Sequence, residues 1–127
     1  MLPLFTGYVK DIHFTNVILG NISRSALTID SGYGSINPSC PSPKKVPVPI
    51  AGVTYTNITQ ATGTWCKHFL DFKGLPDSTI QGVKLENVHI KYQENIESCT
   101  MVEGTFHDAP GAEKCGGLKP ACATVHS

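Results

Sequence analysis

The chain has 127 residues, a length that suits a single domain with one hydrophobic core. Lys plus Arg and Asp plus Glu number ten each, so the formal net charge is zero, which argues against a nucleic-acid-binding protein with its basic surface. No apolar stretch is long enough for a transmembrane helix. Residues 1–5 are too short for a signal peptide, so secretion would require a leader outside this sequence. We therefore expect neither a nucleic-acid partner nor a membrane partner.

The cysteines and the glycosylation motifs indicate an oxidising compartment. Four of the five cysteines fall in loop-like or terminal stretches, namely Cys40, Cys99, Cys115 and Cys122. This usage is typical of secreted proteins. Two motifs for N-linked glycosylation begin at Asn21 and Asn57. Together these features predict a secreted, extracellular protein.

A seven-residue unit occurs three times, at residues 11–17, 52–58 and 82–88. Each copy reads Gly or Asp, aliphatic, polar, large apolar, Thr or Glu, Asn, aliphatic. The alternation of apolar and polar residues is the pattern of a β-strand. A second short alternating segment follows each copy, at residues 26–30, 68–72 and 99–103, so we expect two short strands for each repeat.

Repeats of this spacing predict an all-β fold, a β-solenoid of about three coils. Alternate side chains would point inward and form two stacks, Ile12/Val53/Val83 and Phe14/Tyr55/Leu85. The recurrent Asn16, Asn57 and Asn87 suit turns, because Asn tolerates the left-handed conformation, and stacked Asn amides can bond in a ladder. An antiparallel β-sandwich would show similar alternation, but it does not require the shared unit.

Two segments do not fit the repeat. Residues 33–49 are rich in Pro and Ser and predict an irregular loop. From Gly104 on, Gly, Pro, Cys and Ala dominate, and residues 104–127 are expected to form an irregular tail that caps the last coil. We therefore treat residues 1–127 as part of a single β-helical domain.

Several segments, taken in order, resemble the final coils of glycoside hydrolase family 28, the polygalacturonases. They are residues 7–17, Ile29-Asp-Ser-Gly-Tyr33, Val53 to Thr64, residues 80–88, and Cys99-x-x-Val-x-Gly104 with the later Cys115. The similarity spans roughly residues 7–115. It implies that the solenoid is a right-handed parallel β-helix. It also implies a secreted enzyme that hydrolyses α-1,4-linked galacturonan (pectin) in plant cell-wall material by inversion, without a cofactor.

The family's catalytic motifs are absent from this sequence. Family members carry Asn-Thr-Asp, Asp-Asp, Gly-His-Gly and Arg-Ile-Lys, whereas this chain has no adjacent aspartates, and its only arginine is Arg24. In the family, the stretch similar to residues 7–17 comes directly after Arg-Ile-Lys. The resemblance thus implies that this chain holds no catalytic residue, is inactive alone, and needs the missing N-terminal coils as its partner.

The resemblance also implies one substrate-binding residue, and the cysteines themselves indicate a disulfide. Tyr33 matches a tyrosine that lines the substrate cleft, although a turn tyrosine between Gly32 and Gly34 would look the same. Cys99 would be tied to Cys115, with Cys122 as the competing partner, and the connectivity cannot be read from the sequence.

Other polar groups admit a structural explanation. Asp30 and Asp71 could form an acid–base pair, but turn-capping at strand ends is the preferred interpretation. Lys44 and Lys45 could attract an acidic sugar, although a solvated loop explains them as well. The spacing of Cys and His does not match a metal site, so no metal is expected.

Two other functions remain open. One is a non-catalytic carbohydrate-binding β-solenoid. The other is part of a different β-helical pectinolytic enzyme such as a pectate lyase, which would need carboxylates for Ca²⁺, and the sequence offers no acidic cluster.

Overall fold

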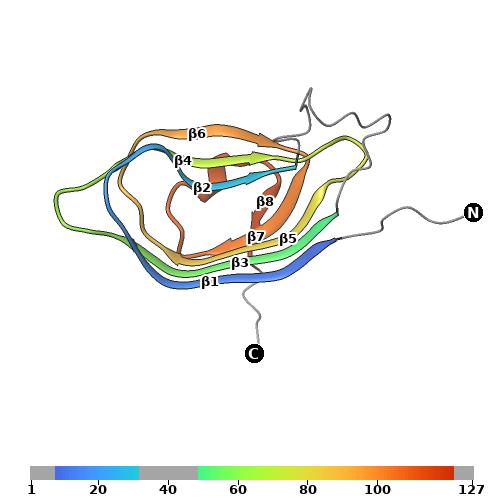
Figure 1. Ribbon diagram of the computed structural model, residues 1–127, viewed down its shortest axis with the longest axis horizontal. Coiled ribbons are helices and arrows are strands. Elements are labelled where there is room, and N and C mark those ends of the chain that lie inside the picture. The colour runs from blue at the N-terminus through green and yellow to red at the C-terminus, as the bar shows by residue number, and fades with distance from the viewer. Residues whose placement is uncertain (1–7, 32–48, 122–127) are drawn as a thin grey trace, which may run out of the picture.

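The computed structural model describes residues 8–31 and 49–121, and these form two parallel sheets that face each other (Figure 1). The five-stranded sheet has the order β1 (Val9–Leu19), β3 (Ile50–Gln60), β5 (Ile80–Val88), β7 (Val102–His107) and β8 (Leu118–Pro120). The three-stranded sheet has the order β2 (Ile22–Asp30), β4 (Cys66–Lys73) and β6 (Tyr92–Thr100). From β1 to β7 successive strands alternate between the two sheets, while β8 stays in the same sheet as β7, and every pair of neighbouring strands is parallel. The prediction of a parallel β-helix is confirmed. Within these two ranges, no helix has the length and apolar character needed to cross a membrane.

The predicted inner stacks have the expected register. Ile12 pairs with Val53, and Phe14 pairs with Tyr55. Tyr55 in turn pairs with Leu85. The rings of Phe14 and Tyr55 stack with their centroids 5.1 Å apart. The repeat unit thus determines the pairing of the strands, because a slip of one residue would move these side chains to the opposite face.

The asparagine ladder forms as predicted. Asn16, Asn57 and Asn87 have φ angles of 59°, 57° and 54°, in the left-handed region. Asn57 Nδ2 donates to Asn16 Oδ1 at 3.0 Å, and Asn87 Nδ2 donates to Asn57 Oδ1 at 3.1 Å. The first position of each unit is also left-handed, at Asp11, Gly52 and Gly82, which explains its restriction to Gly or Asp.

The prediction of the third short strand was wrong. Residues 26–30 lie in β2 and residues 68–72 lie in β4, but their counterpart is β6 (Tyr92–Thr100). The pairing of Cys66 with Tyr92 and of Phe72 with Cys99 places residues 99–103 across the end of β6 and the start of β7. The half-buried pattern of β6 lacks the strict alternation by which the other two strands were found.

Residues 104–121 are more regular than the predicted tail. Gly104 lies within β7, and Leu118 begins β8. A Cβ atom at Gly104 would overlap the carbonyl oxygen of Val83, and one at Gly117 would overlap that of Val102. Glycine at these points therefore permits close backbone approach, which the sequence analysis took for irregular structure. Residues 122–127 and most of the predicted loop, residues 32–48, lie outside the described residues.

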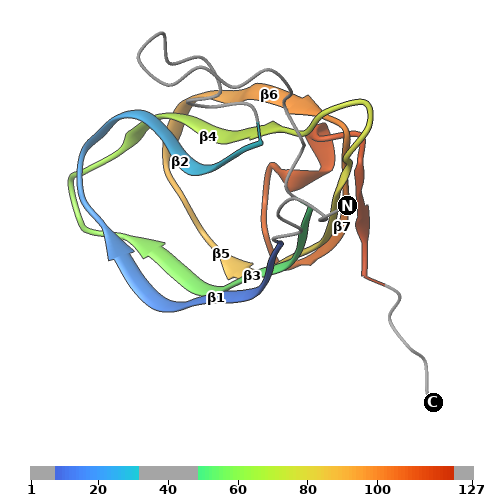
Figure 2. The ribbon, with the colours of Figure 1, turned by 45° about the vertical axis from the view of Figure 1, so that its right-hand side comes forward.

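The last part of the chain closes one end of the solenoid. The 3₁₀ turn η1 (Ala112–Lys114) lies within the outline of the coils in Figure 1, and Figure 2 shows the same segment from another side. Ala109, Ala112 and Leu118 are buried and join the hydrophobic core. A disulfide joins Cys99 of β6 to Cys115, which is one of the two predicted partners.

Candidate functional site

A polar groove of about 650 Å³ lies on the three-stranded sheet, and we call it the sheet groove. Its lining residues come from all three strands: Arg24, Ser25, Thr28, Asp30, Asp71, Lys73 and Glu97. Two basic and three acidic side chains therefore meet at one surface. This composition suits a ligand that carries both negative charge and hydroxyl groups.

The register of β2 and β4 explains how residues distant in sequence come together. Thr28 pairs with Asp71, and Asp30 pairs with Lys73. Alternate residues of a strand share a face, so Asp71 and Lys73 emerge on the same side of β4. Asp30 and Lys73 are the last residues of β2 and β4, so the groove reaches the ends of both strands. Just beyond them, Ser31 N donates to Lys73 O at 2.9 Å.

The ion pair in the sheet groove is loose. Lys73 Nζ lies 3.8 Å from Asp71 Oδ1, and the lysine side chain is 45% exposed. The Asp71 Oδ1 atom is buried and makes no hydrogen bond with the described residues. The contact is long and the ammonium of Lys73 is half-exposed, so the pair contributes little stability and this ammonium can bind an anion at small cost.

Glu97 is held by a different set of contacts. Ser25 Oγ donates to Glu97 Oε1 at 3.4 Å. The same oxygen lies 3.2 Å from His68 Nδ1, without hydrogen-bond geometry at that nitrogen. His68 Nε2 lies 3.0 Å from Glu94 Oε1. These contacts fix the carboxylate of Glu97 at the edge of the groove, which favours a structural role over proton transfer.

Asp30 and Asp71 differ from each other in position. Asp30 is the last residue of β2, as the turn-capping interpretation expects. Asp71 lies within β4, two residues before its end, so the expectation that it caps a turn was wrong. The two carboxylates nevertheless line the same groove.

Of the residues that line the groove, only Asp30 and Asp71 were considered as site residues from the sequence. The others lie outside the repeated unit: Arg24, Ser25, Thr28, Lys73 and Glu97. Glu97 is the extra residue of a register shift, because Leu70 pairs with Ile96 while Asp71 pairs with Ser98. A bulge of this kind turns a side chain toward a site without leaving a signal in the sequence.

The remaining predicted residues are distributed as follows. Tyr33, Cys40, Lys44, Lys45 and Cys122 lie outside the described residues. Asn21 and Asn57 are both exposed, at the start of β2 and within β3. His13 and His89 are exposed as well. In residues 8–31 and 49–121, no three His, Cys, Asp or Glu side chains are grouped as metal ligands would be.

Cys66 is the free cysteine of the described residues, and it is buried. Burial raises the pKa of its thiol, and the Sγ atom donates to Gln60 Oε1 at 3.5 Å. A buried thiol with a raised pKa is a poor nucleophile, so Cys66 serves the core.

The sequence matches the model of one known protein family over most of its length. The family model described as Glycosyl hydrolases family 28 matches residues 3–115. This chain belongs to glycosyl hydrolases family 28. The match covers every strand from β1 to β7, the sheet groove and both cysteines of the disulfide.

Family 28 membership supports a fragment of a polygalacturonase-like glycoside hydrolase and implies a polysaccharide as the class of substrate. Searches of the curated proteins and of the solved structures gave no match.

Proposed function

We propose that the chain forms the C-terminal coils of a secreted, extracellular polygalacturonase-like enzyme that hydrolyses α-1,4-galacturonan by inversion. In this proposal the chain contributes one wall of the substrate cleft and no catalytic carboxylate. The observation that carries the proposal is the sheet groove of a family 28 chain, in which Arg24 and Lys73 stand on neighbouring strands.

The two basic residues suit a polymer with one carboxylate on each sugar. A guanidinium group binds a carboxylate through two parallel hydrogen bonds, and an ammonium group binds it as a point charge. Arg24 lies near the start of β2, and Lys73 is the last residue of β4. We propose that they bind the carboxylates of galacturonate units. Tyr33, two residues after Ser31 in the sequence, would contact a sugar ring beyond the end of β2.

The absence of the family's catalytic motifs from the sequence supports the proposal that this chain does not perform the chemistry. Inversion requires two carboxyl groups about 6.5–9.5 Å apart, one as acid and one as base. Asn-Thr-Asp and Asp-Asp, which carry these groups in the family, do not occur here. Glu97 is already engaged by Ser25 and His68.

The apolar surface at the β1 end supports a continuation of the solenoid. Among the described residues, β1 and β2 are the edge strands of the two sheets at this end. Phe14 is 44% exposed, and a hollow of about 220 Å³ beside it reaches Tyr55 and Ile58 of the next coil. Unpaired edges of this kind are normally covered in proteins. We propose that N-terminal coils of the same enzyme cover them and supply the catalytic groups.

The experiment that tests the proposal is a binding titration with a short oligogalacturonate. We expect Arg24→Ala and Lys73→Ala each to weaken binding by about tenfold, since each removes a charged hydrogen-bond donor. Lys84→Ala is the matched control, because Lys84 is exposed on β5 of the other sheet. Equal affinity for the methyl-esterified oligomer, or no effect of the two groove variants, would contradict the proposal.

A non-catalytic carbohydrate-binding solenoid is the second candidate function. The observation that favours it is a groove with polar and charged residues in a chain whose sequence lacks all four catalytic motifs. The two candidates differ in what assembles with the β1 end. Oligogalacturonate binding that needs no further coils, in a natural protein without the motifs, would favour the second.

A further inference from the structure

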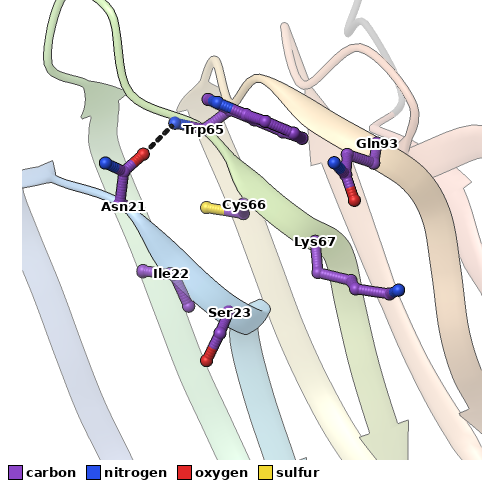
Figure 3. Close-up of a pocket in the computed structure, with 7 residues that line it drawn as sticks. All are labelled: Asn21, Ile22, Ser23, Trp65, Cys66, Lys67 and Gln93. Carbon is purple, nitrogen blue, oxygen red and sulfur yellow. Dashed lines mark hydrogen bonds between the residues drawn. The ribbon is translucent and has the colours of Figure 1, made fainter.

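A second groove, of about 520 Å³, lies where β2, β4 and β6 begin (Figure 3). It is lined by Asn21, Ile22, Ser23, Trp65, Cys66, Lys67 and Gln93. It shares no residue with the sheet groove, which extends to the opposite ends of β2 and β4. Asn21 is the first residue of a glycosylation motif that ends at Ser23.

The amide of Asn21 is oriented with its nitrogen free. Its Oδ1 accepts a hydrogen bond from the backbone N–H of Trp65 at 3.1 Å. The Nδ2 nitrogen makes no hydrogen bond with the described residues, and Figure 3 shows it pointing away from the Trp65 backbone. The side chain is exposed. A substituent on Nδ2 would therefore leave the existing hydrogen bond intact.

Trp65 fixes the oxygen of this amide and leaves the nitrogen uncovered. Its backbone is held on both sides, since Ile22 N donates to Trp65 O at 3.1 Å while Trp65 N donates to Asn21 Oδ1. Figure 3 shows the indole ring extending from its backbone on the side away from Asn21 Nδ2. The ring therefore does not stand in the way of a substituent on this nitrogen.

The second glycosylation motif has the opposite arrangement. Asn57 Nδ2 donates to Asn16 Oδ1, and Asn57 Oδ1 accepts from Asn87 Nδ2, so both ends of the amide are used. Parallel strands lie about 4.8 Å apart, so a sugar on Nδ2 would stand between two stacked asparagines. The left-handed backbone of Asn57 further restricts where its side chain can point.

We propose that Asn21, and not Asn57, carries an N-linked glycan. The inference rests on the extracellular location proposed above. The co-reactant is an oligosaccharide linked to a lipid pyrophosphate. Asn21 Nδ2 forms a bond to the anomeric carbon of the first sugar, the bond from that carbon to the pyrophosphate oxygen breaks, and one amide proton is released.

The site of modification is tested by directing the full chain into the secretory pathway of a eukaryotic cell with an added leader, then mapping glycopeptides by mass spectrometry. We expect a glycan at Asn21 and none at Asn57. Asn21→Gln and Ser23→Ala should each abolish the glycan, whereas Asn57→Gln and Thr59→Ala should leave it. A glycan at Asn57, or a bare Asn21, would overturn the assignment whether or not the chain binds galacturonan.

Discussion

The first and the third copy of the repeat unit follow the same sequence pattern but differ in how far their apolar side chains are exposed. Phe14 of β1 is 44% exposed, whereas Leu85, which occupies the same place in β5, is fully buried. Ile12 is 38% exposed, and its counterpart Val83 is fully buried. The pattern of a unit therefore decides which way a side chain points, and the neighbouring coil decides whether it is buried.

The two ends of the solenoid differ in the segments that cover the core. At the closed end, η1, β8 and the Cys99–Cys115 disulfide bring Ala112, Cys115 and Leu118 into the core. At the open end, the described residues place no segment over Phe14, Val17 and Leu19. The following predictions compare the two ends and proceed from the largest expected effect to the smallest.

Phe72 and Phe14 provide the most direct comparison, because each stacks on Tyr55. Phe72 is fully buried, so Phe72→Ala should lower the free energy of unfolding by about 3–5 kcal/mol, through lost burial and the cavity that remains. Phe14→Ala should cost less than half as much. Urea denaturation followed by circular dichroism measures both. Equal costs would mean that the open end is covered in solution, for example by a second copy of the chain.

Removal of the disulfide should weaken the closed end alone. Its cysteines are separated by 16 residues, and a loop of this size corresponds to about 3 kcal/mol in the chain-entropy account. In the double variant Cys99→Ala/Cys115→Ala, hydrogen exchange should become faster in β7 and β8 and remain unchanged in β1. Faster exchange throughout both sheets would show that the two ends do not unfold separately.

Two adjacent glycines test the close approach of β8 to β7. A methyl group at Gly117 would overlap the carbonyl oxygen of Val102, whereas one at Gly116 would meet open space. Gly117→Ala should destabilise by about 1–3 kcal/mol, as expected for overpacking against a backbone that cannot move aside. Gly116→Ala should change the stability by less than about 0.5 kcal/mol. A thermal unfolding scan of the two variants checks this, and indistinguishable midpoints would count against the packing at this end.

The pH dependence of stability reports on the coil between the two ends. Burial raises the pKa of the Tyr55 phenol above its ordinary value of 10.0. The phenol therefore ionises more readily in the unfolded chain, so its contribution to stability is complete below pH 10 and declines as the pH rises further. Tyr55→Phe retains the ring and should remove this part of the alkaline loss. The same alkaline loss in both proteins would mean that Tyr55 is accessible to water through the open end.

The repeated features were predictable because three copies carry the same information. The register of Phe14 with Tyr55 and the ladder through Asn57 follow from one unit whose Asn occupies a fixed position. For the disulfide, the sequence left two possible partners of Cys99, namely Cys115 and Cys122. The choice of Cys115 depends on the path of the chain through η1, which the sequence does not show.

The features that occur once were not predictable. Glu97 enters the sheet groove at a register shift, and Ser25 reaches Glu97 across the intervening β4. Gly104 and Gly117 resemble loop residues in the sequence, yet they lie where two backbones come together. These positions depend on contacts between distant segments, and no local pattern records them.

The central claim is that this family 28 chain supplies a cleft wall without the catalytic groups. The most direct test is to incubate the purified chain with polygalacturonate and to measure new reducing ends, with Asp71→Asn in parallel. The account predicts no release above the buffer control for either protein. Release by the natural chain that disappears in Asp71→Asn would contradict it, because it would place a catalytic carboxylate in the sheet groove.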